Sequence, residues 1–262
     1  MKSISILGSG WLGLPLAEHF VKQDLQVKAS TTSAHRQTEI SAVNAQPFIV
    51  DIENLADDIQ AFLQSEALII NITSKNIDAF GQLAREIELS PVDRVLFVGS
   101  TSVYSEVCGV VSEADNAESV DSPLLKIEQL LTRNSGFSTT LVRFAGLVGP
   151  GRHPGRFFSS GRAVPNPEAR VNLIHLDDCI GIINRIIEQQ CWDEVFNCCA
   201  DTHPSRREFY SLAARSLGDP IPEFNKSGSK SDKIISNLKV KKQLDYKFKH
   251  ADLMRMLEAH AC

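Results

Sequence analysis

The stretch from Ser3 to Gly13, SISILGSGWLG, decides the fold of this chain. Its first five residues form a short apolar run typical of a β-strand, and Gly8, Gly10 and Gly13 follow in a G-x-G-x-x-G arrangement. The helical periodicity of LAEHFVKQ begins shortly afterwards. A glycine-rich turn between a strand and a helix presents backbone amides at the positive end of the helix dipole. We therefore expect this turn to bind the diphosphate of a dinucleotide.

Each of the three glycines has a separate predicted role. Gly8 permits the tight turn, Gly10 lets the backbone approach the diphosphate, and Gly13 lets the helix pack closely against the sheet. Trp11 and Leu12 lie between the last two glycines and complete the predicted cofactor-binding loop. Such a turn can be purely structural, but its position at the start of a regular β/α chain favours binding.

Strand-like and helical segments alternate along most of the chain. Parallel strands cannot be joined by tight turns, so this spacing predicts a parallel sheet with crossover helices. The strand-like runs are residues 3–7, 26–31, 48–52, 67–73, 94–100, 139–149, 171–176 and 195–199, and the helical runs are 16–23, 78–88, 122–133, a segment from Asp177, 205–218 and 251–260. We predict an α/β fold, a Rossmann-type doubly wound parallel sheet with a small C-terminal substrate domain.

A loop-rich insert beginning at Gly149-Pro150-Gly151-Arg152 interrupts the regular alternation, and the alternation ends after residue 199. We therefore assign residues 1–149 and 171–199 to a dinucleotide-binding Rossmann domain. Residues 150–170 and 200–262 are assigned to a small substrate-side domain.

Composition and charge exclude several classes of protein. The chain is 43% hydrophobic and 23% charged, as globular proteins are, and its net charge of −5 gives no basic stripe for nucleic acid. No apolar run approaches the roughly 18 residues of a membrane span, and the first residues lack a signal-peptide pattern. We expect a cytoplasmic monomer or homodimer that binds neither nucleic acid nor membrane.

The six cysteines form no C-x-x-C pair and no metal-like Cys/His spacing, so we expect buried free thiols and no metal site. They are Cys108, Cys179, Cys191, Cys198, Cys199 and Cys262. Alternation along the last strand-like run predicts that only one of Cys198 and Cys199 points inward.

The end of the second strand-like run indicates which dinucleotide binds. Folds that bind NAD carry Asp or Glu there to hold the ribose 2′-hydroxyl, whereas this run ends in Thr31-Thr32, with Arg36 downstream. Hydroxyls and an arginine suit a 2′-phosphate, which a carboxylate would repel. We predict NADP as the cofactor, with NAD as the alternative. A solvated helix position is the other interpretation of Arg36.

The ends of the next two strand-like runs supply further predicted cofactor contacts. Asp51 and Ile52 lie where the adenine edge would be in such a fold, although Asp51 equally suits a helix cap. Thr73 ends the fourth run and is included among the predicted cofactor-binding residues.

Several motifs in the same order make the chain resemble the extended and atypical short-chain dehydrogenase/reductases, particularly their sugar-nucleotide epimerase-like group. These motifs are GSGWLG (8–13), GSTSVYS (99–105), LVRFAGLVGPGR (141–152), NLIHLDDCIGII (172–183), and the tail segments 196–218 and 231–244. The resemblance implies a Rossmann domain with a small C-terminal substrate domain.

The resemblance also implies catalysis by a Ser or Thr together with a Tyr and a Lys in the pattern Y-x-x-x-K. Ser100 matches the family serine, four residues before Tyr104, although an ST-turn would also explain it. Counting back from Glu128 places the family's Tyr and Lys at Val120 and Leu124, and neither side chain can transfer a proton.

Three other residues are candidates to replace this pair. Lys126 is displaced from the lysine position by two residues, about 200° on a helix, so we expect it at the surface. Asp78 lies near the family's Asn, where atypical members are similar in having Asp, and it can act as a base or stabilise a helix N-terminus. Tyr104 is the one tyrosine of the N-terminal half. The predicted catalytic residues are Ser100, Asp78 and Tyr104.

Arg143 and the turn ending at Arg152 resemble the family's substrate-side loop. Both arginines are predicted to bind a phosphate or carboxylate of an anionic substrate. Arg152, His153 and Arg156 form a small basic rim, which a solvated loop would also explain. Asp177, in a stretch resembling the family's I-H-x-x-D, is expected to cap a helix.

Two functions follow from these residues. One is an NADP-dependent oxidoreductase or epimerase/dehydratase-like enzyme acting on a small polar substrate, such as a nucleotide sugar. In it, Ser100 polarises the reacting oxygen and Asp78 or Tyr104 handles the proton. The other is a non-catalytic NADP-binding sensor or scaffold, because losing the Tyr and Lys removes the usual proton donor.

Overall fold

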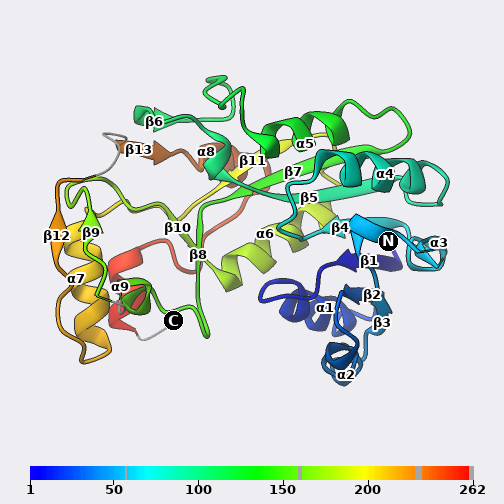
Figure 1. The fold of residues 1–262 in the computed structure, drawn as a ribbon, viewed down its shortest axis with the longest axis horizontal. Coiled ribbons are helices and arrows are strands. Elements are labelled where there is room, and N and C mark those ends of the chain that lie inside the picture. The colour runs from blue at the N-terminus through cyan, green and yellow to red at the C-terminus, as the bar shows by residue number, and fades with distance from the viewer. Residues whose placement is uncertain (57, 159–160, 228–231, 260–262) are drawn as a thin grey trace. The chain divides into compact units, whose positions relative to one another are not determined.

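A seven-stranded sheet organises the computed structural model, which describes residues 1–56, 58–158, 161–227 and 232–259. Its strand order is β11-β7-β5-β4-β1-β2-β3 (Figure 1). The strands are β1 (Ser3–Leu7), β2 (Gln26–Thr31), β3 (Gln46–Ile49), β4 (Ala67–Ile70), β5 (Arg94–Ser100), β7 (Ser138–Phe144) and β11 (Val195–Cys198). This is the order of a doubly wound Rossmann-type sheet, so the predicted fold class is confirmed.

The sheet is wound outward from β1 in both directions. Ile4 of β1 lies opposite Val27 of β2 on one side and Ala67 of β4 on the other, and both pairings are parallel. The chain moves from β1 through β2 to β3, then returns to β4 on the far side of β1. The carboxyl ends of β1 and β4 therefore form a topological switch point, where ligands bind in sheets of this kind.

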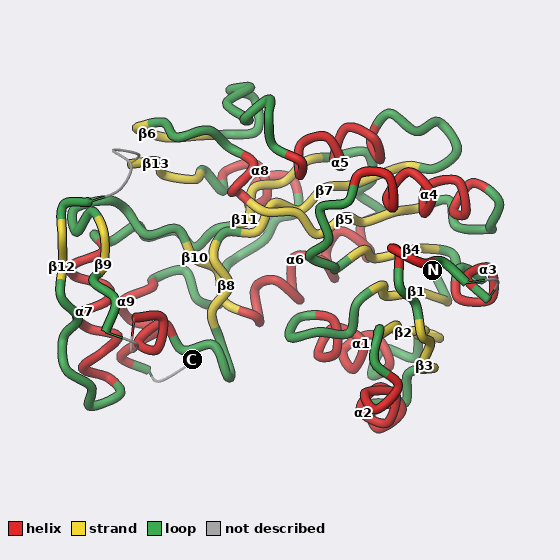
Figure 2. The backbone as a smooth tube through the Cα atoms, in the orientation of Figure 1, coloured by secondary structure: helices red, strands yellow, loops and turns green. Residues whose placement is uncertain are grey.

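Nine α-helices accompany the strands in the described residues (Figure 2). They are α1 (Gly13–Val21), α2 (Gln37–Ala42), α3 (Ile59–Phe62), α4 (Ile77–Glu88), α5 (Pro123–Thr132), α6 (Leu176–Gln189), α7 (Arg206–Ser216), α8 (Leu238–Gln243) and α9 (Leu253–Glu258). The predicted start of α5 is correct, because Ser122 caps it and Pro123 follows. None of the helices within the described residues is both long and apolar enough to cross a bilayer.

Short parallel strand pairs and 3₁₀ turns complete the described elements. The pairs are β6 (Cys108–Val111) with β13 (Asp232–Ile235), β8 (Gly146–Val148) with β10 (Leu173–His175), and β9 (Val164–Pro165) with β12 (Phe224–Asn225). The 3₁₀ turns are η1 (Ala34–Arg36), η2 (Ile52–Asn54), η3 (Thr101–Val103) and η4 (Pro154–Phe158).

The chain divides into two compact units, each with its own hydrophobic core. Unit 1 comprises Met1–Gly99, Val120–Val142 and Ile186–Val195, and unit 2 comprises Ser100–Ser119, Arg143–Arg185 and Phe196–Cys262. In unit 1, Phe80 of α4 packs edge-on against Phe97 of β5. In unit 2, Phe209 of α7 packs in a cluster with Leu253 and Leu257 of α9.

The single strand predicted over residues 139–149 is wrong. The chain forms β7 in the large sheet, breaks at Ala145, and continues as β8, which pairs with β10. The backbone N–H of Gly146 already donates to Asn172 O, so the chain has changed strand partners by that residue. A Cβ at Gly146 would lie 2.6 Å from the end of the Leu173 side chain, so a larger residue there would require Leu173 to move.

The burial of the cysteines varies more than predicted. Cys198 and Cys199 are both fully buried, contrary to the predicted alternation, because β11 ends at Cys198 and Cys199 turns its thiol toward Leu173 O. Burial raises the pKa of the Cys199 thiol to about 12, so it stays protonated at neutral pH. Cys179 is buried as predicted, whereas Cys108 is exposed and Cys191 half-buried. Cys262 lies outside the described residues.

Helix α7 offers a test of local stability in unit 2. Ser205 accepts from Glu208 N, and the Glu208 carboxylate accepts from Ser205 N, so both ends of a capping box are present. We expect Ser205→Ala to lower the free energy of unfolding by about 1 kcal/mol. Urea denaturation of the variant and of Ser227→Ala, a matched exposed serine, measures the difference; equal stability would contradict the capping role.

Candidate functional site

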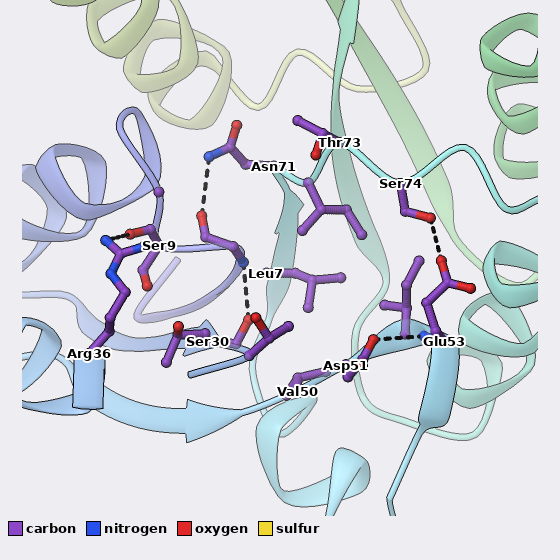
Figure 3. Close-up of a pocket in the computed structure, with 16 residues that line it drawn as sticks. Leu7, Ser9, Ser30, Arg36, Val50, Asp51, Glu53, Asn71, Thr73 and Ser74 are labelled. Carbon is purple, nitrogen blue, oxygen red and sulfur yellow. Dashed lines mark hydrogen bonds between the residues drawn. The ribbon is translucent and has the colours of Figure 1, made fainter. Parts of the chain in front are cut away.

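A cavity of about 350 Å³ opens at the carboxyl ends of β1, β2 and β4 in unit 1 (Figure 3). It is lined by the glycine turn and by the segments that follow β2, β3 and β4. The lining residues are Leu7–Gly10, Ser30–Thr32, Arg36, Val50–Glu53 and Asn71–Ser74. The cavity therefore lies at the switch point that the strand order creates.

Close backbone packing holds the glycine turn in shape. Gly8 has a φ of +99°, and a Cβ there would lie 2.3 Å from Asn71 O. A Cβ at Gly13 would lie 2.0 Å from Gly8 O, which explains why α1 can begin so close to β1. A Cβ at Gly10, by contrast, would meet nothing within 4 Å. Internal packing thus requires two of the glycines, while Gly10 leaves an open approach to the backbone.

Polar side chains from two neighbouring strands fasten the turn. Gly8 N donates to Ser30 Oγ at 3.0 Å, and Asn71 Nδ2 donates to Gly8 O at 3.1 Å. Ser9 N donates to Ser30 O at 2.8 Å. These bonds engage the amides of Gly8 and Ser9 internally. Leu14 N donates to Gly10 O and Pro15 has no N–H, so the amides available to a ligand include those of Gly10, Leu12 and Gly13.

The first turn of α1 has no side-chain cap. Its N-cap residue is Leu12, which has no polar group, and no acidic residue follows in the first turn. The short helices α2, α3 and α8 also lack a side-chain cap, whereas Asn76 caps α4, Ser205 caps α7 and Asp252 caps α9. Uncapped amides at a helix N-terminus attract an anion, because they carry the positive end of the helix dipole.

The Ser9 hydroxyl supplies an independent sign of a ligand. Ser9 is buried and lines the cavity, yet its Oγ has no hydrogen-bond partner among the described residues. A buried hydroxyl normally has a partner, since leaving it unpaired is costly. A bound oxygen acceptor in the cavity would provide one.

The two ends of the cavity differ in charge. At one end, Arg36 Nη2 donates to Ser9 O at 3.0 Å, and its Nε lies 3.1 Å from the Glu39 carboxylate (Figure 3). At the other end, Glu53 accepts from Ser74 and Asn76. These two hydrogen bonds lower the pKa of Glu53, so this carboxylate is ionised at neutral pH.

Most of the residues predicted to bind the cofactor line this one cavity. They are Gly8, Gly10, Thr31, Thr32, Arg36, Asp51, Ile52 and Thr73. Trp11, Leu12 and Gly13 are not among the lining residues, and the Leu12 side chain is buried. Asp51 also has the capping role considered for it, because it accepts from Glu53 N at the start of η2.

Sequence reasoning missed several lining residues, including Ser9, Ser30, Glu53, Asn71 and Ser74. Ser30 and Asn71 act on the backbone of the turn, through contacts that no sequence spacing reveals. One signal was available, because each of the five lies within two residues of a residue that was predicted.

The predicted catalytic residues fall in different units. Asp78 is exposed in the first turn of α4 in unit 1, which fits the helix-stabilising interpretation. Ser100 ends β5 in unit 2, and its Oγ accepts from Ser102 N at 3.1 Å, which is the ST-turn considered for it. The hydroxyl proton of Ser100 is not used by that contact.

Tyr104 and Arg143 belong to a buried polar network in unit 2. Tyr104 Oη donates to Asn197 Oδ1 at 2.9 Å and accepts from Arg143 Nη1 at 2.8 Å. Arg143 also pairs with Glu118, and its guanidinium lies over the Tyr104 ring. Burial raises the pKa of Tyr104, so its phenol stays neutral near pH 7. Both side chains therefore already have structural partners.

Val120 and Leu124, predicted to replace the family's Tyr and Lys, differ in burial. Val120 is 79% exposed, and Leu124 packs against the core of unit 1. Lys126 is exposed, as predicted. Glu128, used for the count, is buried in α5.

The remaining predicted residues lie in unit 2. Arg152 and Arg156 are exposed, and His153 Nδ1 accepts from Gly155 N. Asp177 is the second residue of α6 and lies in its first turn, so the prediction that it caps the helix is wrong. The strand β10 runs directly into this helix at Leu176, which leaves no separate capping residue at Asp177.

The fold and the glycine turn define a class of protein: the chain has a Rossmann-type dinucleotide-binding fold, which it shares with solved structures of the short-chain dehydrogenase/reductase superfamily. By sequence, the chain belongs to the family of Protein YeeZ of Escherichia coli K12, with 33% identity over 98% of this chain and 99% of that protein. A scan against family models found no match.

Solved structures share the fold over nearly the whole chain. A short-chain dehydrogenase/reductase superfamily protein from Agrobacterium tumefaciens with bound NAD has a TM-score of 0.83 and 18% identity, covering 99% of this chain and 96% of that one. A UDP-glucuronic acid 4-epimerase from Bacillus cereus in complex with NAD has a TM-score of 0.78 and 19% identity, covering 98% and 97%.

The different surroundings of two glycines predict different effects on stability. Gly13→Ala would force its Cβ against Gly8 O, so we expect unfolding to become easier by about 2 kcal/mol. Gly10→Ala enters open space and is expected to leave stability within about 0.5 kcal/mol of the parent. Urea denaturation of both variants tests this, and equal losses would show that the turn is packed differently.

Proposed function

We propose that the chain is an NADP-dependent oxidoreductase or epimerase/dehydratase-like enzyme that acts on a small polar substrate, with nucleotide sugars as the leading class. The observation that carries the proposal is the cavity of unit 1, which is lined both by Gly10, with open space beside it, and by Ser9, whose buried hydroxyl has no partner among the described residues. Relatives of the same fold bind NAD, and one of them acts on UDP-glucuronic acid.

The residues of the glycine turn fit a diphosphate. The amides at the start of α1 would hold its oxygens, and Gly10 would leave room for it beside the backbone. The unpartnered Ser9 Oγ would donate to one of the same anionic oxygens. Asp51 and Ile52, which follow β3, would contact the adenine.

The end of β2 fits a 2′-phosphate better than a free ribose hydroxyl. Thr31, Thr32 and Arg36 line that end of the cavity, and no carboxylate occupies the positions directly after β2. The Arg36 side chain is about one-third exposed, so it is hydrated enough to exchange its contact with Glu39 for a phosphate. The carboxylate of Glu53 lies at the opposite end in Figure 3 and would not repel that phosphate directly.

The bound dinucleotide would supply hydride transfer. In this proposal, Ser100 polarises the reacting oxygen of the substrate, since the hydroxyl proton remains available while Ser102 N holds the oxygen in place. Asp78 is the better of the two predicted proton carriers, because its carboxylate is exposed whereas the Tyr104 phenol is buried and bonded. The exposed Arg152 would bind an anionic part of the substrate.

The boundaries proposed for the substrate-side domain, residues 150–170 and 200–262, place Arg152 within it. The alternative function, a non-catalytic NADP-binding sensor or scaffold, is favoured by Val120 and Leu124 at the positions of the family's Tyr and Lys. Both proposed functions require NADP binding, but only the enzyme converts a substrate.

Cofactor preference is the first test. We expect NADPH to bind more tightly than NADH, and Arg36→Gln to weaken NADPH binding by about tenfold to a hundredfold, because a charged hydrogen bond to phosphate is lost. NADH binding should be unchanged in this variant. Fluorescence titration of both cofactors, with Arg85→Gln as an exposed arginine control, measures the effect; tighter NADH binding by the parent protein would overturn the NADP assignment.

Turnover is the second test. NADPH oxidation, or its formation from NADP, is followed with aldehydes, ketones and nucleotide sugars, and Ser100→Ala is expected to reduce any turnover by about a hundredfold or more. Asp78→Asn should reduce it as well, whereas Tyr104→Phe should mainly reduce stability.

Binding and turnover together separate the two functions. Tight NADPH binding without turnover of any substrate would favour the sensor. Turnover that survives in Ser100→Ala would remove Ser100 from the proposed chemistry.

A further inference from the structure

Two histidines and an aspartate that are distant in the sequence meet in unit 2. They are His175, at the end of β10, Asp177, in the first turn of α6, and His250, in the segment before α9. One ligand atom from each lies within 4.8 Å of the other two. The chain separation of 73 residues between Asp177 and His250 explains why no spacing in the sequence pointed to this group.

The three side chains lie within hydrogen-bonding or ring-contact distance of one another. Asp177 Oδ2 lies 3.2 Å from His250 Nε2 and 3.5 Å from His175 Nδ1. The two imidazole rings lie with their centroids 3.8 Å apart at an angle of 42°. His175 is buried, His250 is partly buried and Asp177 is about half exposed, so the group is accessible from its aspartate side.

A separate buried anchor fixes the position of His250. The fully buried Asp178 accepts from Lys249 N at 2.7 Å and from His250 N at 3.0 Å. It also accepts from the Tyr246 hydroxyl at 3.0 Å. Because Asp177 and Asp178 are adjacent, the same helix turn that holds the backbone of His250 also presents a carboxylate to its ring.

Two of the three ligand separations, those from Asp177, match the spacing of a tetrahedral metal site. The two imidazole rings would have to move apart on binding, because their centroids are only 3.8 Å from each other. Nitrogen and oxygen ligands at about 2.0–2.1 Å from zinc stand about 3.4 Å apart. The two separations from Asp177 Oδ2 are 3.2 and 3.5 Å. Two imidazoles and one carboxylate are also a ligand set that zinc and similar first-row ions favour.

We propose that His175, Asp177 and His250 bind one divalent transition-metal ion of the zinc class. The fourth position would face solvent beside Asp177 and hold water. The ion would tie the segment before α9 to the start of α6, which makes it a structural cross-link. The site belongs to unit 2 and is independent of the proposed dinucleotide function.

The same atoms also make contacts that the ion would have to replace. Asp177 N donates to His175 Nδ1 at 3.1 Å, and the contact between His250 Nε2 and Asp177 is of hydrogen-bond length. If the group does not bind metal, its three side chains only form hydrogen bonds between α6 and the segment before α9. The experiment distinguishes metal binding from this purely hydrogen-bonded arrangement.

The experiment titrates Zn²⁺ into the full chain by calorimetry after treatment with a chelator. We expect one bound equivalent and a higher Tm with Zn²⁺. Asp177→Asn and His250→Ala should each weaken binding by about tenfold or more. His35→Ala, an exposed histidine of unit 1, is the matched control and should bind as the parent does.

Co²⁺ absorption then identifies the ligands. Tetrahedral d–d bands without a thiolate charge-transfer band, lost in Asp177→Asn, support the proposed site. A thiolate band would assign the ion to an exposed cysteine such as Cys108 and overturn the proposal. Absence of Zn²⁺ binding below millimolar concentration, or equal binding by all variants, would also overturn the proposal. The three side chains would then serve only as hydrogen-bonding groups. Asp177→Asn changes a half-exposed group with little change of shape, so it remains informative should His250→Ala fold poorly.

Discussion

The contact between the start of α1 and the end of β1 is the constraint on which the dinucleotide-binding interpretation rests. Gly13 lies so close to Gly8 O that no side chain fits between them. This closeness places the start of α1 directly after the turn whose residues Gly8, Ser9 and Gly10 line the cavity. Ser30 and Asn71 hold the turn from the neighbouring strands β2 and β4, so the shape of the turn depends on three adjacent strands.

Among the described residues, each unit has one buried side-chain atom without a hydrogen-bond partner. Around the cavity of unit 1, Ser9 Oγ lacks a partner and Gly10 faces open space, which leaves interactions for a ligand to complete. In unit 2, Tyr104, Arg143 and Glu118 are bonded to one another in a buried network, and the unpaired atom is Nδ2 of Asn197, whose Oδ1 accepts from Tyr104. A residue can therefore match a family motif and still be occupied by structural contacts, which is why the pattern of satisfied and unsatisfied groups guides the assignment of roles.

Much of the cofactor cavity was predictable because its residues follow strands. The ends of parallel strands meet at one edge of a sheet, so the positions after β1, β2, β3 and β4 could be brought together from the strand pattern alone. Ser30, Asn71 and Glu53 were missed because they act through hydrogen bonds to backbone or to other loops. The break at Ala145 was missed because residues 141–148 form one strand-like run in the sequence, whereas β7 and β8 pair with different strands.

By itself the sequence determined the parallel α/β fold, since alternating apolar runs and glycine punctuation are local properties of the chain. It also predicts, from the resemblance, that Val120 and Leu124 replace the family's Tyr and Lys. Tertiary structure alone decided which polar groups have partners and which distant residues meet. The grouping of His175 and Asp177 with His250 depends on Asp178 capturing the tail backbone, and a contact across 73 residues leaves no periodic trace in the sequence.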